Sequence, residues 1–208
     1  LSLQAEYQEA ERNYRAAVEL QRQTTTNDQQ DGIQSRATVA KSQSGLGYAL
    51  LRLGRLPEAE QALRDALAMQ RQLYPGANAD VARTLQDLAL VVSKRGDSRN
   101  ALPVMEQALA MQRELRGALP HPALAETLNN LGLLLYNGGE YQRSGALLEE
   151  AVAMKRKLLG ERHPEIAVGL NNLAMLMQDR GDLPRAEATF RQALAMHREL
   201  VGSEHPEV

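Results

Sequence analysis

Three histidines recur at intervals of 42 residues, and a row of this kind could hold a metal ion or move protons. They are His121, His163 and His205. No carboxylate or second histidine accompanies them at the helical spacing that zinc ligands use, so we expect no metal and no other cofactor. Each of the three precedes a proline, which is favoured in the first turn of a helix. We therefore interpret the row as a set of helix starts.

Other patterns of catalytic residues are missing. The sequence has no glycine loop for phosphate, no His-Glu-x-x-His zinc motif and no nucleophile elbow. It has no cysteine, which excludes disulfide bonds and thiolate ligands. The neighbouring acids Glu149 and Glu150 would point to different faces of a helix. We therefore predict that this chain is not an enzyme.

The histidines belong to a longer internal repeat of 42 or 43 residues. The motif Ala-x-Ala-Met ends at Met69, Met111, Met154 and Met196. Leucine followed by a small residue occurs at Leu46, Leu88, Leu131 and Leu173. Glycine occurs in the same phase at Gly54, Gly96, Gly139 and Gly181. Three series in one register indicate a repeat architecture, with the methionines in its core.

Each repeat is expected to contain two helices that reverse direction at the glycine. Before Gly139, apolar residues of helical period occur at Leu124, Leu128, Leu131 and Leu135. Glycine suits the reversal because it readily adopts the left-handed conformation that ends many helices. The expected helices are residues 3–23, 34–53, 56–73, 79–95, 98–116, 122–137, 140–159, 164–180 and 183–201. The fold class is therefore all-α.

We expect residues 1–208 to form a single solenoid fragment. It would contain an orphan second helix at 3–23, repeats at about 34–73, 79–116, 122–159 and 164–201, and the start of a further repeat at 205–208. The polar segment from Thr24 to Asp31 adds seven residues to the usual spacing and is interpreted as a long loop. Both ends are interpreted as cuts within a longer array, whose exposed apolar faces could self-associate.

Two short stretches carry a more specific signal. Residues 127–132 read Thr-Leu-Asn-Asn-Leu-Gly and residues 170–174 read Leu-Asn-Asn-Leu-Ala, while Gly-x-x-x-x-Ala-Glu occurs at 54–60 and 181–187. These motifs resemble the 42-residue tetratricopeptide repeats of kinesin light chain. The resemblance implies a tetratricopeptide repeat (TPR) α-solenoid, a right-handed superhelix of antiparallel helix pairs. Its concave groove would be lined by the first helix of each pair and would bind peptides.

The resemblance also suggests contact residues. In kinesin light chain the groove binds short acidic motifs through asparagines and basic side chains. By the match to Leu-Asn-Asn, Asn129 and Asn171 are candidate contacts to a peptide backbone, whereas Asn130 and Asn172 are expected to pack between repeats. The alternative, in which the asparagines hydrogen-bond between adjacent repeats without a ligand, stays open.

One face of each first helix, next to its core face, is polar with an apolar middle row. The candidate groove residues on it are Ser44, Tyr48, Arg52, Gln86, Leu90, Lys94, Asn129, Leu133, Tyr136, Asn137, Asn171, Met175 and Gln178. Such a surface can pair with peptide amides while accepting side chains. The last position of the face runs through Arg52, Lys94, Asn137 and Asp179. We therefore hypothesise a groove that is basic at its N-terminal end and acidic at its C-terminal end, the alternative being solvated charges without a partner.

Composition excludes several function classes. The net charge is −2 and aromatic residues make up 3%, which disfavours nucleic acid as a partner. No apolar run is long enough to span a membrane. Arginine outnumbers lysine 20 to 4, which is typical of a GC-rich bacterial genome, and the lack of cysteine fits a cytoplasmic location.

We predict a protein- or peptide-binding scaffold. The first alternative is a regulatory or sensor arm of a larger signalling ATPase or protease whose catalytic domain lies outside residues 1–208. The second is a self-associating structural array.

Overall fold

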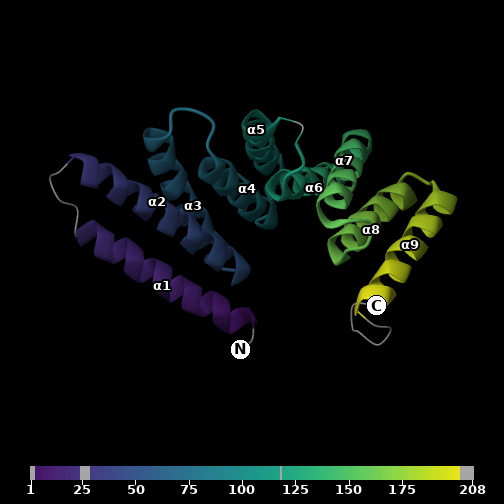
Figure 1. The fold of residues 1–208 in the computed structure, drawn as a ribbon, viewed down its shortest axis with the longest axis horizontal. Coiled ribbons are helices and arrows are strands. Elements are labelled where there is room, and N and C mark those ends of the chain that lie inside the picture. The colour runs from purple at the N-terminus through teal and green to yellow at the C-terminus, as the bar shows by residue number, and fades with distance from the viewer. Residues whose placement is uncertain (1–2, 24–28, 118, 202–208) are drawn as a thin grey trace. The chain divides into compact units, whose positions relative to one another are not determined.

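The computed structural model describes residues 3–23, 29–117 and 119–201, and within these residues it contains nine helices and no strand (Figure 1). The helices are α1 (Leu3–Gln23), α2 (Gln29–Arg52), α3 (Leu56–Leu73), α4 (Ala79–Lys94), α5 (Ser98–Arg116), α6 (Pro122–Asn137), α7 (Tyr141–Leu159), α8 (Pro164–Asp179) and α9 (Leu183–Val201). The predicted all-α fold class is confirmed, and the helix bounds agree with the predicted ones to within one residue except at the start of α2.

The prediction of a loop from Thr24 to Asp31 was wrong at its C-terminal end. Helix α2 already begins at Gln29, five residues before the predicted start. These first residues are polar and lack an apolar stripe, so no hydrophobic pattern in the sequence marks the start of this helix. Residues 24–28 of the predicted loop lie outside the described residues.

The chain divides into two compact units, residues 1–115 and 116–208. In the N-terminal unit, α2 packs against α1, α3 and α4, and α3 also packs against α4. Its core is formed by leucines and small residues, with fully buried side chains such as Leu50, Leu63 and Leu85. In this unit the first helices of two successive repeats, α2 and α4, therefore lie next to each other.

The C-terminal unit repeats this arrangement with α6 to α9. Helix α6 packs against α7, α7 against α8 and α8 against α9, while α6 also contacts α8. Its core cluster is Leu148, Val152, Ile166, Ala167, Leu170, Leu173, Leu176, Ala193 and Met196. Of the predicted core methionines, Met154 and Met196 are buried, whereas Met69 and Met111 are half-buried.

The Leu-Gly pairs of the repeat have a packing reason. A methyl group added at Gly47 would lie 2.5 Å from Cγ of Leu63, and one added at Gly132 would lie 2.8 Å from Cγ of Leu148. Both leucines are fully buried and belong to the second helix of the same pair. Glycine at these two positions therefore sets how closely the two helices of a pair approach.

Two of the three histidines start helices, as the sequence predicts. The Nδ1 atom of His121 accepts a hydrogen bond from the backbone N–H of Ala123 at 3.2 Å, and Nδ1 of His163 accepts one from Glu165 at the same distance. Each ring thereby satisfies one of the free N–H groups at a helix start. His205 lies outside the described residues.

The cap at His121 leads to a prediction about pH. Burial, and then the charge of Arg116, lower the pKa of His121, so the folded state favours the neutral ring that caps α6. Because the unfolded chain then binds more protons, stability is complete above about pH 6.5 and falls as the pH drops through that value towards the lowered pKa. We expect His121→Asn, which can still cap, to remove this part of the acid sensitivity in urea unfolding midpoints measured between about pH 5 and pH 8. An unchanged pH profile would contradict this.

Candidate functional site

The N-terminal unit carries six of the predicted groove residues on α2 and α4. Arg52 and Lys94 are exposed, and Tyr48 and Leu90 are half-buried. Ser44 shares a 2.9 Å hydrogen bond with the hydroxyl of Thr84 across the two helices. Gln86 is only 5% exposed, so little of its amide is available to a ligand.

Two tyrosines and two arginines form an aromatic–cationic cluster on this unit, made of Tyr7, Tyr48, Arg52 and Arg83. The tyrosine rings meet edge to face, with centroids 6.2 Å apart and planes at 72°. The guanidinium carbon of Arg52 lies 5.2 Å from the centre of the Tyr7 ring, and that of Arg83 lies 5.7 Å from the centre of the Tyr48 ring. Both distances are in the range of cation–π attraction, which holds the arginines in place.

The cluster explains the titration of its half-buried tyrosine. Burial is the main cause that raises the pKa of the Tyr48 hydroxyl, followed by its hydrogen bond and charge interaction with Tyr7. Arg52 acts in the opposite direction and lowers that pKa. Tyr48 therefore stays a neutral hydroxyl at physiological pH.

Sequence reasoning missed Tyr7 as a member of the cluster. Helix α1 was identified as the second helix of a pair, and second helices are expected away from the groove. The available signal was the scarcity of aromatic residues, since the whole chain has six tyrosines, one phenylalanine and no tryptophan. Tyrosines on neighbouring helices of such a chain are good candidates for a shared cluster.

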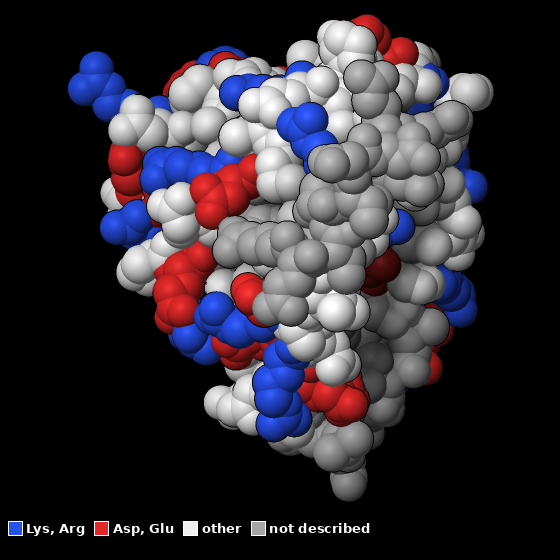
Figure 2. Space-filling model, turned by 90° about the vertical axis from the view of Figure 1, so that its left-hand side faces the viewer, with Lys and Arg blue, Asp and Glu red and all other residues white. Residues whose placement is uncertain are grey.

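The exposed charges of α2 and α4 are mainly basic. From Ile33 onward, the exposed charged residues of these two helices are Arg36, Lys41, Arg52, Asp80, Arg83 and Lys94. The remaining acid, Asp87, is only 3% exposed. On the face seen in Figure 2, basic and acidic side chains lie side by side without a broad basic area. The local excess suits a short acidic ligand better than a long polyanion.

The C-terminal unit presents the other predicted groove residues on α6 and α8. Asn137, Asn171, Met175 and Gln178 are exposed, and Asn129, Leu133 and Tyr136 are half-buried. The Tyr136 hydroxyl donates a 2.5 Å hydrogen bond to Oδ2 of Asp179, and this bond is the main cause that raises the pKa of Tyr136. The Tyr136 ring also lies 5.8 Å from that of Tyr141. Tyr136 is thus held by the protein itself.

The asparagines of this unit differ in their contacts. Asn172 donates from Nδ2 to Oδ1 of Asn129 at 3.2 Å, which joins α8 to α6. This bond agrees with the packing role expected for Asn172, but it also engages Asn129, for which a ligand contact was predicted. Asn171 is exposed, and its Nδ2 lies 3.7 Å from the sulfur of Met175 on the same helix.

Neither a metal site nor a membrane span emerges from the described residues. Among them, no three His, Asp or Glu side chains gather closely enough to hold a metal ion. Within the same ranges, no helix has the length and apolar character to cross a membrane.

Comparison with known proteins identifies the family. One family model for the tetratricopeptide repeat matches residues 38–114 and 123–199, and a second matches residues 87–157. The chain belongs to the tetratricopeptide repeat family. Its TPR α-solenoid fold is of the kinesin light chain-like type, as the resemblance of its motifs implies. No curated protein matches the chain.

Solved structures of several other TPR proteins are similar to this TPR chain. BtubC (BKLC) from P. vanneervenii has 24% identity and a TM-score of 0.80, with 97% of this chain and 76% of that chain covered. A putative kinesin light chain of Podosopora anserina has 23% identity and a TM-score of 0.67, covering 91% of this chain and 96% of that one. A Rap protein complexed with competence and sporulation factor has 14% identity and a TM-score of 0.68, and the match covers 93% of this chain and 51% of the Rap chain. These similarities establish the fold.

Proposed function

We propose that this TPR chain is a peptide-binding scaffold, and that the α2–α4 face of its N-terminal unit binds an acidic segment of a partner protein. The aromatic–cationic cluster is the observation that carries the proposal. Membership of the TPR family supports a role in protein interaction, and the similar Rap protein was solved with a bound factor.

The geometry of the cluster suits carboxylates. The guanidinium groups of Arg52 and Arg83 lie over tyrosine rings. The N–H groups at the edge of each guanidinium can therefore donate hydrogen bonds to a ligand. Because the rings already limit their motion, less side-chain entropy is lost when a carboxylate binds. The exposed amines of Lys41 and Lys94 add attraction at longer range, which increases the association rate more than the affinity.

The α6–α8 face of the C-terminal unit offers different chemistry. Val168 is 48% exposed and Met175 is 39% exposed, and the amide of Asn171 lies beside them on the same helix. Apolar side chains next to an amide can accept apolar residues of a peptide while pairing with its backbone. Its exposed acids, Glu126 and Asp179, disfavour acidic ligands here. We therefore assign to this face an apolar or basic segment, in keeping with the hypothesis of opposite charges at the two ends.

A matched set of peptides tests the proposal. Short fluorescein-labelled peptides rich in Asp and Glu are compared with versions in which every acid is replaced by its amide. We expect saturable binding, seen as a rise in fluorescence anisotropy, for acidic peptides only, and a loss of affinity as salt is raised from about 50 to 500 mM. Equal affinity for the acidic and amide versions would refute the proposed ligand class, even if both bind.

A further inference from the structure

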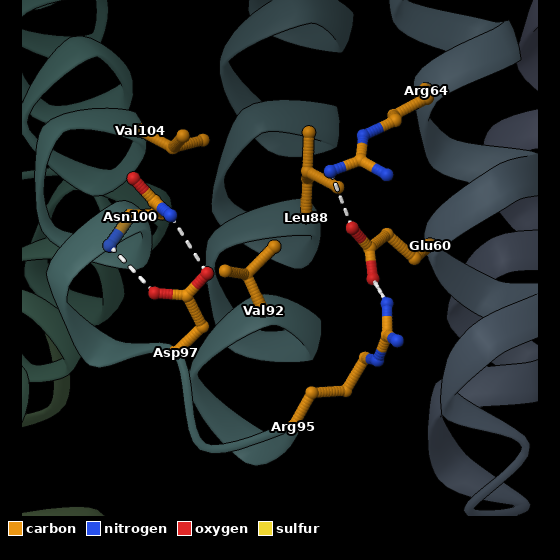
Figure 3. Close-up of a pocket in the computed structure, with 8 residues that line it drawn as sticks. All are labelled: Glu60, Arg64, Leu88, Val92, Arg95, Asp97, Asn100 and Val104. Atoms are coloured by element: carbon orange, nitrogen blue, oxygen red, sulfur yellow. Dashed lines mark hydrogen bonds and ion pairs between the residues drawn. The ribbon is translucent and has the colours of Figure 1, made fainter.

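A second candidate site lies on the opposite side of α4 from the aromatic–cationic cluster. A cavity of about 340 Å³ opens between α3, α4 and α5 (Figure 3). Its lining residues are Glu60, Arg64, Leu88, Val92, Arg95, Asp97, Asn100 and Val104. On α4, Leu88 and Val92 point away from Arg83, as their helical spacing requires. This volume falls in the range of small-molecule sites, and the floor is aliphatic.

One wall of the cavity is a charged group that we call the Glu60 wall, made of Glu60, Arg64 and Arg95. Figure 3 shows the Glu60 carboxylate between the two guanidinium groups, with one oxygen bonded to each. Glu60 is only 5% exposed, whereas both arginine side chains reach solvent. Two arginines share one carboxylate in this wall, so they keep N–H donors that Glu60 does not use. The other acid of the lining, Asp97, balances the remaining positive charge over the cavity as a whole.

The same arrangement occurs one repeat earlier, but there it contains a second carboxylate. Glu11 and Arg15 precede Glu60 and Arg64 by 49 residues each, and Arg55, from the turn of the following repeat, bonds to Glu11 at 2.7 Å. In addition, Oε2 of Glu58 lies 3.0 Å from Arg15 and 2.5 Å from Arg55. At that wall, two arginines are thus paired with two carboxylates of the chain itself.

The position equivalent to Glu58 carries no carboxylate beside the Glu60 wall, and the second acid of the cavity, Asp97, stands 42 residues after Arg55 instead. The residue 42 positions after Glu58 is Asn100, which has no charge. Asn100 turns to the other side of the cavity, where its Nδ2 donates to Oδ2 of Asp97 at 2.7 Å and its backbone N–H donates to Oδ1 at 3.2 Å (Figure 3). The cavity therefore lies where the neighbouring repeat places a carboxylate of its own.

We propose that this cavity binds a small aliphatic carboxylate, whose charged group pairs with Arg64 and Arg95 as Glu58 pairs with its two arginines. The hydrocarbon part of the ligand lies on Leu88, Val92 and Val104. A branched acid of about six carbon atoms suits the volume and the aliphatic floor. The site is separate from the α2–α4 face, so it does not depend on the peptide-binding function proposed above.

Titration of the ¹⁵N-labelled 208-residue chain with 4-methylpentanoate, followed by NMR, tests this site. We expect saturable shifts of backbone amides at the start of α3, the end of α4 and the start of α5. The matched probe 4-methylpentanamide has the same hydrocarbon part without the charge and is expected to bind at least about tenfold more weakly. Equal binding of the amide, or shifts scattered outside these three segments, would overturn the proposal.

Two substitutions at one position sharpen the test. Asn100→Glu supplies the missing carboxylate from the chain itself, whereas Asn100→Gln has the same length and no charge. Both keep the backbone N–H that Asp97 caps, and glutamate is favourable at this position of a helix start. We expect Asn100→Glu to lower the affinity for 4-methylpentanoate at least about tenfold, and Asn100→Gln to bind like the parent. Unchanged binding by Asn100→Glu, or equal loss in both variants, would overturn the proposal.

Discussion

Reversing two charges of the aromatic–cationic cluster, with Arg52→Glu and Arg83→Glu in one chain, is expected to lower the affinity for an acidic peptide about 100-fold. Each guanidinium lies over a tyrosine ring and would pair with a carboxylate of the ligand. A glutamate in its place loses this pair and repels the ligand, for which a tenfold loss per residue, about 1.4 kcal/mol, is a moderate expectation. Fluorescence anisotropy with the labelled acidic peptide measures the change.

A control with the same change in net charge separates local pairing from long-range attraction. Arg12 on α1 and Arg99 on α5 are exposed residues of the same unit and lie outside the cluster. Arg12→Glu and Arg99→Glu in one chain are expected to lower the affinity less than about threefold, through the overall field alone. If the control loses as much affinity as the cluster variant, general charge attracts the peptide, and the cluster has no particular role.

The largest effect on stability is expected where the two helices of the first full repeat meet. Leu63 is fully buried, and its side chain occupies the space opposite Gly47. Leu63→Ala should destabilise the fold by about 2–5 kcal/mol because it removes buried surface and leaves a cavity. Gly47→Ala should destabilise it by about 1–3 kcal/mol because the added methyl group has no room.

The two changes are coupled, and this coupling is the sharper test. In the double variant, the methyl group at position 47 enters space that Leu63 has vacated. The double variant should therefore lose at least about 0.5 kcal/mol less unfolding free energy than the two single variants lose in total. Urea unfolding of the parent, the two single variants and the double variant measures this coupling. Gly76 has open space around its Cβ position and an ordinary backbone angle, so Gly76→Ala should leave stability nearly unchanged. Strict additivity of the two core changes would contradict the close approach at Gly47.

The sequence predicts the helices well because each of them carries its own evidence. Apolar residues at helical period, prolines after His121 and His163, and glycines such as Gly139 mark the elements and their ends locally. The start of α2 was the exception, because Gln29 and its neighbours carry no apolar pattern that marks a helix.

The candidate site was less predictable because it depends on contacts between helices. The face of α4 was assigned by spacing, yet Gln86 on that face is buried. Tyr7 joins the cluster only because α1 packs against α2. The bond from Asn172 to Asn129 spans 43 residues, and a single sequence offers no rule that separates it from a ligand contact. Side-chain pairing across repeats is set by tertiary geometry rather than by local pattern.

Paramagnetic labelling of the ligand tests the central claim most directly. An acidic peptide with a nitroxide spin label at one end is added to the ¹⁵N-labelled chain, and the broadening of each backbone amide signal is measured by NMR. Our account predicts strong broadening along α2 and α4, including the amides of Tyr48 and Arg83, and its loss when excess unlabelled peptide competes. Broadening confined to α3 and α5, or spread evenly over the surface, would contradict it.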